Sequence, residues 1–138
     1  MNIIDGGVTA PEGFFATGVS CGIKKDGKKD LAIVCSEDSA AVSGVFTSNT
    51  VKGHSLQVTM EHIRSGYATA IVINSGNANA CVGERGYRDA KEIAAITAGF
   101  LECNPEDVLV ASTGVIGVPL DMDAIRSGIE KAVEGMDP

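Results

Sequence analysis

The clearest feature of the hydrophobic pattern is a pair of buried strands in the second half of the chain. Residues 68–74 and 108–111 are nearly continuous apolar runs rich in β-branched side chains, typical of strands buried on both faces of a sheet. Between them, residues 84–102 carry apolar side chains at helical spacing, and Asn104 and Pro105 then predict the end of that helix. The order strand–helix–strand predicts a βαβ crossover with parallel, adjacent strands.

The first third of the chain predicts an antiparallel hairpin. Residues 14–23 alternate small, apolar and polar side chains, and residues 31–35 are continuously apolar. The charged segment Lys24–Asp30 between them is interpreted as a solvent-exposed turn. A third strand is predicted at residues 41–47, where the alternation is imperfect but several side chains are apolar.

The last element predicted is a helix over residues 121–134, with Asp121 as its N-cap. No repeat or low-complexity linker divides the chain, so residues 1–138 are predicted to form a single domain or an incomplete one. The expected fold is an α/β (α+β layered) domain, a mixed β-sheet packed by helices. Because the chain stops soon after a helix that should lead into another element, we expect the N-terminal part of a larger unit.

Composition and charge exclude several function classes. A formal net charge of −7 argues against a nucleic-acid surface, which needs clustered Lys and Arg. No segment approaches the roughly 20 apolar residues that span a bilayer. The first residues carry neither the basic start nor the apolar run of a signal peptide, so a cytoplasmic location is expected.

The cysteines and histidines do not predict a metal site. The four cysteines include no CxxC pair, and the chain has two histidines, whereas metal sites need three or four ligands brought together. A small thiol or metal protein is therefore poorly supported. Small or apolar neighbours favour buried free thiols at all four positions, which are Cys21, Cys35, Cys81 and Cys103.

Two short polar segments follow the carboxyl ends of the two predicted buried strands. They are loops of small residues over Asn74–Asn79 and Ser112–Gly117, and ligands bind outside the carboxyl ends of parallel strands. The hydroxyl of Thr113 beside the N–H of Gly114 would form an oxyanion hole, which stabilises the negative oxygen that develops when a carbonyl is attacked. Such residues are also ordinary turn chemistry, and on the residues alone both interpretations stand.

The sequence shows no nucleophile–base pair to accompany these loops. It contains no G-x-S-x-G elbow, P-loop or G-x-G-x-x-G fingerprint. Neither histidine lies near the loops in sequence, although both could approach them in space. His62, within Glu61–Arg64, is interpreted as a residue on the surface of a helix.

Five segments, in order, make the chain resemble the glutamate N-acetyltransferase (ornithine acetyltransferase) family along nearly its whole length. Each alone is weak, but the five together are specific to that family. They are Gly7–Phe14, Lys29–Ala32, Gly44–Asn49, Asn74–Cys81 and Ser112–Gly117.

The resemblance implies an enzyme that moves an acetyl group from N-acetylornithine to glutamate in arginine biosynthesis, with no bound cofactor. Some family members also use acetyl-CoA as a co-substrate. The family's oxyanion hole matches Thr113 and Gly114. Its precursor cuts itself before a Thr, whose freed amine and hydroxyl act as base and nucleophile. The residues expected to shape the substrate pocket are Asn74, Ser75, Gly76, Asn77 and Asn79.

In the family, the cleavage site and its Thr lie beyond position 138. We therefore expect this chain to be inactive alone and to need a second (β) chain that carries the Thr, in a heterotetramer of two α and two β chains. A truncated, non-catalytic paralogue or structural partner chain is the alternative. One departure is Asn49–Leu56, which stands where the family usually carries Ala-Ala-Pro-Val after a lysine and so bears on local packing and substrate access.

Overall fold

Over residues 6–136, the part of the chain that the computed structural model describes, four strands form one mixed sheet in the order β1-β2-β3-β4. β1 pairs with β2 and β2 with β3 in antiparallel fashion, whereas β3 and β4 are parallel. The predicted hairpin, βαβ crossover and α+β class are confirmed. The strands are β1 Phe14–Val19, β2 Leu31–Ala41, β3 Tyr67–Asn77 and β4 Val108–Val115.

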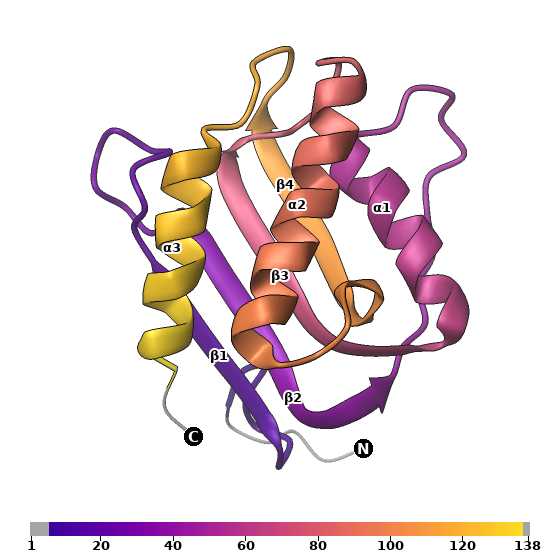
Figure 1. The fold of residues 1–138 in the computed structure, drawn as a ribbon, viewed down its shortest axis with the longest axis vertical. Coiled ribbons are helices and arrows are strands. Elements are labelled where there is room, and N and C mark those ends of the chain that lie inside the picture. The colour runs from indigo at the N-terminus through magenta and orange to yellow at the C-terminus, as the bar shows by residue number, and fades with distance from the viewer. Residues whose placement is uncertain (1–5, 137–138) are drawn as a thin grey trace.

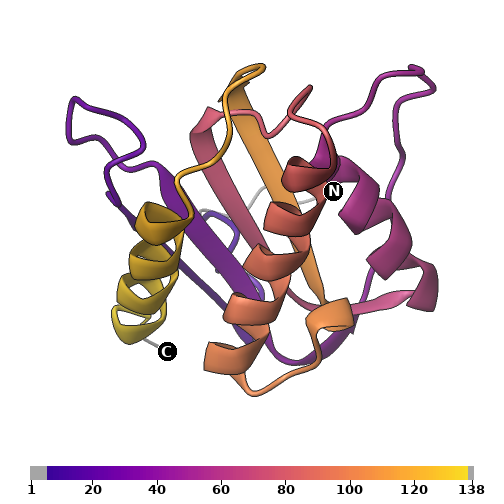
Figure 2. The ribbon, with the colours of Figure 1, turned by 45° about the horizontal axis from the view of Figure 1, so that its top comes forward.

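Three α-helices pack on this sheet: α1 His54–His62, α2 Glu84–Leu101 and α3 Met122–Glu134. Figures 1 and 2 show α2 and α3 over one face of the sheet and α1 beside β4. Two short 3₁₀ turns, η1 Ile63–Ser65 and η2 Pro105–Asp107, lead into β3 and β4. Asp121 caps α3 as predicted, because its carboxylate accepts a hydrogen bond from the N–H of Ala124 at 3.1 Å. Among the described helices, none is long and apolar enough to cross a membrane.

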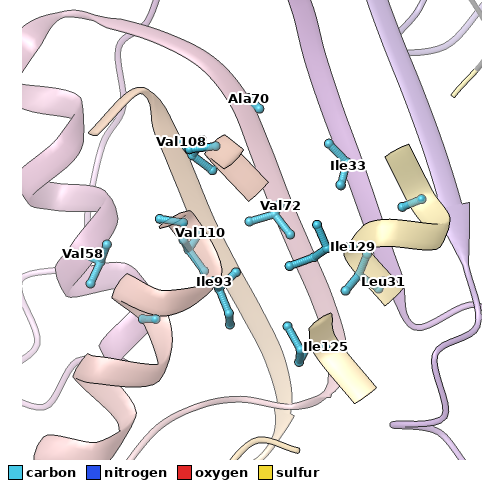
Figure 3. Close-up of a cluster of buried hydrophobic side chains, with 14 of the residues drawn as sticks. Leu31, Ile33, Val58, Ala70, Val72, Ile93, Val108, Val110, Ile125 and Ile129 are labelled. Carbon is cyan, nitrogen blue, oxygen red and sulfur yellow. The ribbon is translucent and has the colours of Figure 1, made fainter. Parts of the chain in front are cut away.

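The apolar core lies between the sheet and helices α2 and α3. Side chains that point to the same side of β2, β3 and β4 meet Ile93 from α2, and Ile125 and Ile129 from α3, all at most 1% exposed (Figure 3). Alternation along the strands puts every second residue on this face. The sheet residues in the cluster include Leu31, Ile33, Val72, Val108 and Val110.

The opposite face of the sheet is not covered by any helix within residues 6–136 (Figures 1 and 2). It carries apolar side chains all the same, and Phe14 and Ile71 are each 37% exposed there. Helices therefore cover one face of the mixed sheet, and over residues 6–136 no helix covers the other, partly apolar face.

Helix α1 completes the outer edge of β4 with side-chain hydrogen bonds. The hydroxyl of Thr59 donates to the carbonyl of Val110 at 2.7 Å and accepts from the Val110 N–H at 2.8 Å. His62 Nδ1 lies 2.8 Å from the carbonyl oxygen of Val108, which can only accept. The prediction that His62 lies on a helix surface is wrong: it is 5% exposed, because it satisfies a strand edge.

The strand predicted at residues 41–47 is also wrong. β2 continues to Ala41, and its last residues, Ala40 and Ala41, pair with Ala68 and Tyr67 after an irregularity in the register. The chain beyond has no strand left to pair with and stays irregular until α1, with Val45 fully exposed. The imperfect alternation of apolar and polar residues over 41–47 is consistent with this, because a half-buried strand needs a regular alternation.

The thiols and the first loop correct two further expectations. All four cysteines are free, but their exposure differs: Cys35 is buried, Cys21 and Cys103 are half-buried, and Cys81 is exposed in a turn with a φ of +58°. In the segment Lys24–Asp30, residues 25–29 are exposed, Lys24 is half-buried and Asp30 is only 2% exposed. A wholly solvated turn is therefore wrong, because the Asp30 carboxylate organises the loop from inside.

The carboxylate of Asp30 accepts hydrogen bonds from the backbone N–H of Cys21 at 2.7 Å and of Lys24 at 2.8 Å. Burial acts to raise the pKa of Asp30, but the hydrogen bonds from the backbone of Cys21 and Lys24, together with smaller contributions from the Cys21 thiol and the Gly22 backbone, hold the pKa below its ordinary value. A depressed carboxyl pKa stabilises the fold above the unfolded pKa of about 4. That stability is lost as the pH falls through the folded value.

We therefore expect Asp30→Asn to lower the free energy of unfolding at pH 7 by roughly 2 kcal/mol, since an amide is a weaker acceptor than a carboxylate. The variant should also lose part of the decline in stability that the parent chain shows below about pH 4. Urea unfolding at a series of pH values measures both effects. Asp26→Asn is the control, because Asp26 is an exposed acid in the same loop; equal behaviour of the two variants would contradict the role of Asp30.

Candidate active site at the carboxyl edge of the sheet

The two polar segments singled out in the sequence lie side by side. The register pairs Asn74 with Ser112 and Ser75 with Thr113, and the parallel ladder continues to the end of both strands. Most of these residues therefore lie within paired strand ends, which corrects the expectation of two loops. The structure brings the expected site residues together at the carboxyl edge of β3 and β4, where ligands bind parallel sheets.

A contact between two glycines allows the strand ends to approach this closely. Gly76 and Gly114 are directly paired, and their φ angles of +110° and +131° favour glycine. A Cβ on Gly114 would collide with the carbonyl carbon of Gly76 and would lie 2.6 Å from the backbone N of Asn77. The position of Thr113, one residue earlier, is therefore set by backbone packed directly on backbone.

The three asparagines of the first segment brace this edge from within. Asn77 Nδ2 donates across to the carbonyls of Val118 and Pro119, at 2.8 and 3.1 Å. Asn74 Nδ2 donates to the carbonyl of Asn77 at 2.9 Å, and Asn77 Oδ1 accepts from the N–H of Asn79 at 3.0 Å. All three side chains are at most 8% exposed. None of the three lines the cavity, and the side-chain oxygens of Asn74 and Asn79 are buried without a hydrogen-bond partner among the described residues.

A cavity of about 440 Å³ opens beside the ends of these strands, between them and the first turn of α1. This volume is within the usual range for small-molecule sites. Its wall is made mainly of small and apolar residues and includes Gly114, and its polar side chains are Ser55, Thr59 and Ser112.

Thr113 itself is exposed at the sheet end. Side chains alternate along β4, so Thr113 belongs to the same sheet face as Leu109, whose partner across the register is Ile71 on the open face.

The first turn of helix α1 is the part of this site that the sequence did not predict. Ser55, in its first turn, is 2% exposed and lies at the wall of the cavity. Asn49–Leu56, the segment that departs from the family's usual sequence, leads into this turn. Its residues Gly53, Ser55 and Leu56 line the cavity. The backbone N–H of His54 donates to the carbonyl of Asn79 at 2.9 Å, so this histidine does approach the first segment. The start of α1 was not predictable because its N-cap residue is Gly53, which has no side chain to cap the helix.

His54 and the acidic residues do not form an obvious catalytic or metal centre. Both ring nitrogens of His54 are buried without a hydrogen-bond partner, and its ring lines a separate cavity with Tyr87 and Arg88. Among residues 6–136, no three His, Cys, Asp or Glu side chains lie close enough together to hold a metal ion. The polar groups that this edge offers are hydroxyls and backbone N–H groups.

Several known proteins are similar to this chain in sequence. The model of the ArgJ family matches residues 15–137. The arginine biosynthesis bifunctional protein ArgJ of Caldanaerobacter subterraneus is 55% identical over 132 residues, which cover 96% of this chain and 32% of that protein. The ArgJ protein of Symbiobacterium thermophilum is 48% identical over 140 residues, or 100% of this chain and 35% of that protein. The chain thus spans about a third of the length of these relatives.

Solved structures agree in fold. The ornithine acetyltransferase of Mycobacterium tuberculosis, solved in complex with ornithine, superposes with a TM-score of 0.92 at 42% identity, covering 95% of this chain and 71% of that chain. The ArgJ protein of Bacillus halodurans superposes with a TM-score of 0.88, also at 42% identity, covering 91% of this chain and 66% of that one.

Proposed function

This chain belongs to the ArgJ family, and from that premise we propose that it forms the α-chain side of an acetyltransferase active site. The reaction moves an acetyl group from N-acetylornithine to glutamate in arginine biosynthesis. Thr113 and Gly114 supply the oxyanion hole. The observation that carries this proposal is the packing of Gly114 on Gly76, which fixes the Thr113–Gly114 peptide at the carboxyl edge of two parallel strands.

Acyl transfer makes a specific demand that this edge can meet. When a nucleophile attacks the acetyl carbonyl, its oxygen becomes negative, and donors already held in place stabilise that charge without reorganising. A hydroxyl beside a backbone N–H on rigid, paired strands fits this demand. The nucleophile in the proposed reaction is a Thr at the start of a second chain, whose own amine serves as base.

The second chain is proposed to pack on the open side of the sheet and on the segment beyond β4. Phe14 and Ile71 are partly exposed on that face, and the exposed apolar residues Val115, Ile116 and Val118 follow Thr113 directly. Contiguous exposed apolar surface marks interaction sites. Because Thr113 faces the same side, a chain docked there would bring its nucleophile to the proposed oxyanion hole. The proposed assembly is a heterotetramer of two α and two β chains.

The proposal extends to substrates and location. Both substrates are small amino acids, with acetyl-CoA as an alternative acetyl donor, and the reaction needs no resident cofactor. We place the enzyme in the cytoplasm, where the four free thiols of this chain would stay reduced.

Acetyl transfer by a chimera tests the function. In it, this segment replaces the matching third of the Caldanaerobacter subterraneus relative, to which it is 55% identical. We expect transfer of acetyl from N-acetylornithine to glutamate at a rate close to that of the parent relative. A chimera that folds and assembles but transfers no acetyl would favour a non-catalytic role for this chain.

A further inference from the structure

The polar groups in the wall of the active-site cavity form a chain of hydrogen bonds. Asn79 Nδ2 lies 3.3 Å from Ser55 Oγ and 2.9 Å from the carbonyl of Gly86, and Ser55 Oγ lies 2.7 Å from Ser112 Oγ. The chain links the first segment, helix α1 and the end of β4. Asn79 is fully buried and Ser55 is 2% exposed, so water does not compete at that end.

The chemistry of Asn79 sets the direction of this chain. An amide nitrogen only donates hydrogen bonds, so Ser55 Oγ accepts from Asn79. Ser55 Oγ could accept from Ser112 as well, but its own buried proton would then have no partner, so donation to Ser112 Oγ is the arrangement that satisfies Ser55. The hydroxyl of Ser112 therefore accepts from Ser55 and keeps its own proton. In the described part of the chain, no second hydrogen-bond partner takes that proton.

The remaining polar side chain of the cavity wall is already committed. The hydroxyl of Thr59 both donates to and accepts from the backbone of Val110. Ser112 thus holds the uncommitted side-chain donor of an otherwise small and apolar cavity. It lies two residues before Gly114, which lines the same cavity.

We propose that Ser112 is a substrate-binding hydroxyl whose proton is directed into the cavity by Asn79 acting through Ser55. Its ligand is an oxygen acceptor of the substrate, a carbonyl or carboxylate oxygen. This inference rests on the proposed function, because it takes the cavity beside Gly114 as the place where part of the substrate lies. Ser112 alternates with Thr113 along β4, so the substrate would extend around the end of this edge strand, from the cavity to the acetyl position at Thr113 and Gly114. Ser55 is a positioning residue: it touches no ligand, and it acts by orienting the hydroxyl of Ser112.

The test uses the chimera described above and separates the two substrates. Ser112→Ala is expected to raise KM roughly tenfold for the substrate whose oxygen it contacts, the loss typical of one hydrogen bond at a buried site. Varying N-acetylornithine and glutamate in turn identifies that substrate. Ser112→Thr keeps the hydroxyl and should restore KM to within about twofold of the parent value.

Ser55→Ala tests whether Ser55 acts by orienting the hydroxyl of Ser112 or only by filling space in the cavity wall. It removes the group that orients Ser112 but leaves the Ser112 hydroxyl in place, so its effect on KM should be smaller than that of Ser112→Ala. Thr97→Val is the matched control, since Thr97 is a fully buried hydroxyl in α2 that bonds to the carbonyl of Ile93. It should change the unfolding temperature while leaving KM for both substrates unchanged.

Two results would overturn the inference. One is a KM in Ser112→Ala equal to that of the parent for both substrates; the other is an equal rise in KM in Ser112→Ala, Ser55→Ala and Thr97→Val, which would mean a structural role. Calorimetric binding of N-acetylornithine and of glutamate provides the same comparison without catalysis. A parent chimera that binds but transfers no acetyl would contradict the proposed function alone, and weaker binding by Ser112→Ala would still support the role of Ser112.

Discussion

Replacing Thr113 with Ala in the chimera is expected to lower kcat for acetyl transfer about a hundredfold or more, because one of the two proposed oxyanion donors is lost. A hundredfold loss corresponds to roughly 2.7 kcal/mol of transition-state stabilisation. The side chain is exposed at the end of β4, so the fold should be little affected. KM should change much less than kcat, since the donor acts on charge that develops in the transition state.

The conservative variant Thr113→Ser makes this expectation specific. It keeps the hydroxyl and removes one methyl group, so kcat should stay within roughly tenfold of the parent rate. Steady-state kinetics of the parent and the two variants decide the matter. An unchanged kcat in Thr113→Ala would remove Thr113 from the oxyanion hole.

Gly114→Ala is expected to lower the free energy of unfolding of the chain by about 4 kcal/mol, the second large effect. Its φ of +131° is unfavourable for any side chain, and the added Cβ would collide with backbone atoms of Gly76 and Asn77 that belong to the paired strand. Overpacking and forced dihedrals each cost roughly 1–3 kcal/mol. Urea unfolding followed by circular dichroism measures the change.

Gly117→Ala separates the two costs expected of Gly114→Ala, the collision of the added Cβ and the unfavourable φ angle. Gly117 lies in the same segment with a φ of +80°, but nothing lies within 4 Å of the position that a Cβ would occupy. Its replacement should cost only about 1 kcal/mol, from the left-handed conformation alone. Equal losses in the two variants would show that contact between the glycines does not set the geometry of the site.

The strands and helices that carry the strongest periodic patterns were predictable from the sequence. The apolar run before Asn74, the helix before Pro105 and the N-cap at Asp121 are local signals, and each element forms where it was expected. The prediction of a strand at residues 41–47 was wrong because strand pairing depends on residues far apart in sequence. The end of β2 already pairs with the first residues of β3, so residues 42–47 have no strand to pair with. A helix was expected around His62, but the start of α1 and its packing at the site were missed. No side chain caps that start, and a hydroxyl such as that of Ser55 is not recognised in the sequence as part of a buried face.

The candidate site was predictable in its location but not in its construction. Parallel strands with small polar residues at their carboxyl ends place Asn74 beside Ser112, as the register shows. The direct packing of Gly76 on Gly114 depends on the register of two strands far apart in sequence. The contacts of Ser55 and Asn79 depend on where α1 docks. Such long-range pairings leave no mark in local sequence periodicity.

The most direct test of the central claim is acetylation of the second chain in the absence of glutamate. The proposed β chain of the Caldanaerobacter subterraneus relative, which begins at the cleavage Thr, is incubated with N-acetylornithine and followed by intact-mass spectrometry. It is measured alone and together with an α chain in which this segment is joined to the stretch of the relative that leads up to that Thr. If this segment supplies the oxyanion hole, about one acetyl group per site should appear on that Thr in the complete assembly and almost none without the segment. Acetylation at the same rate without residues 1–138 would contradict the account.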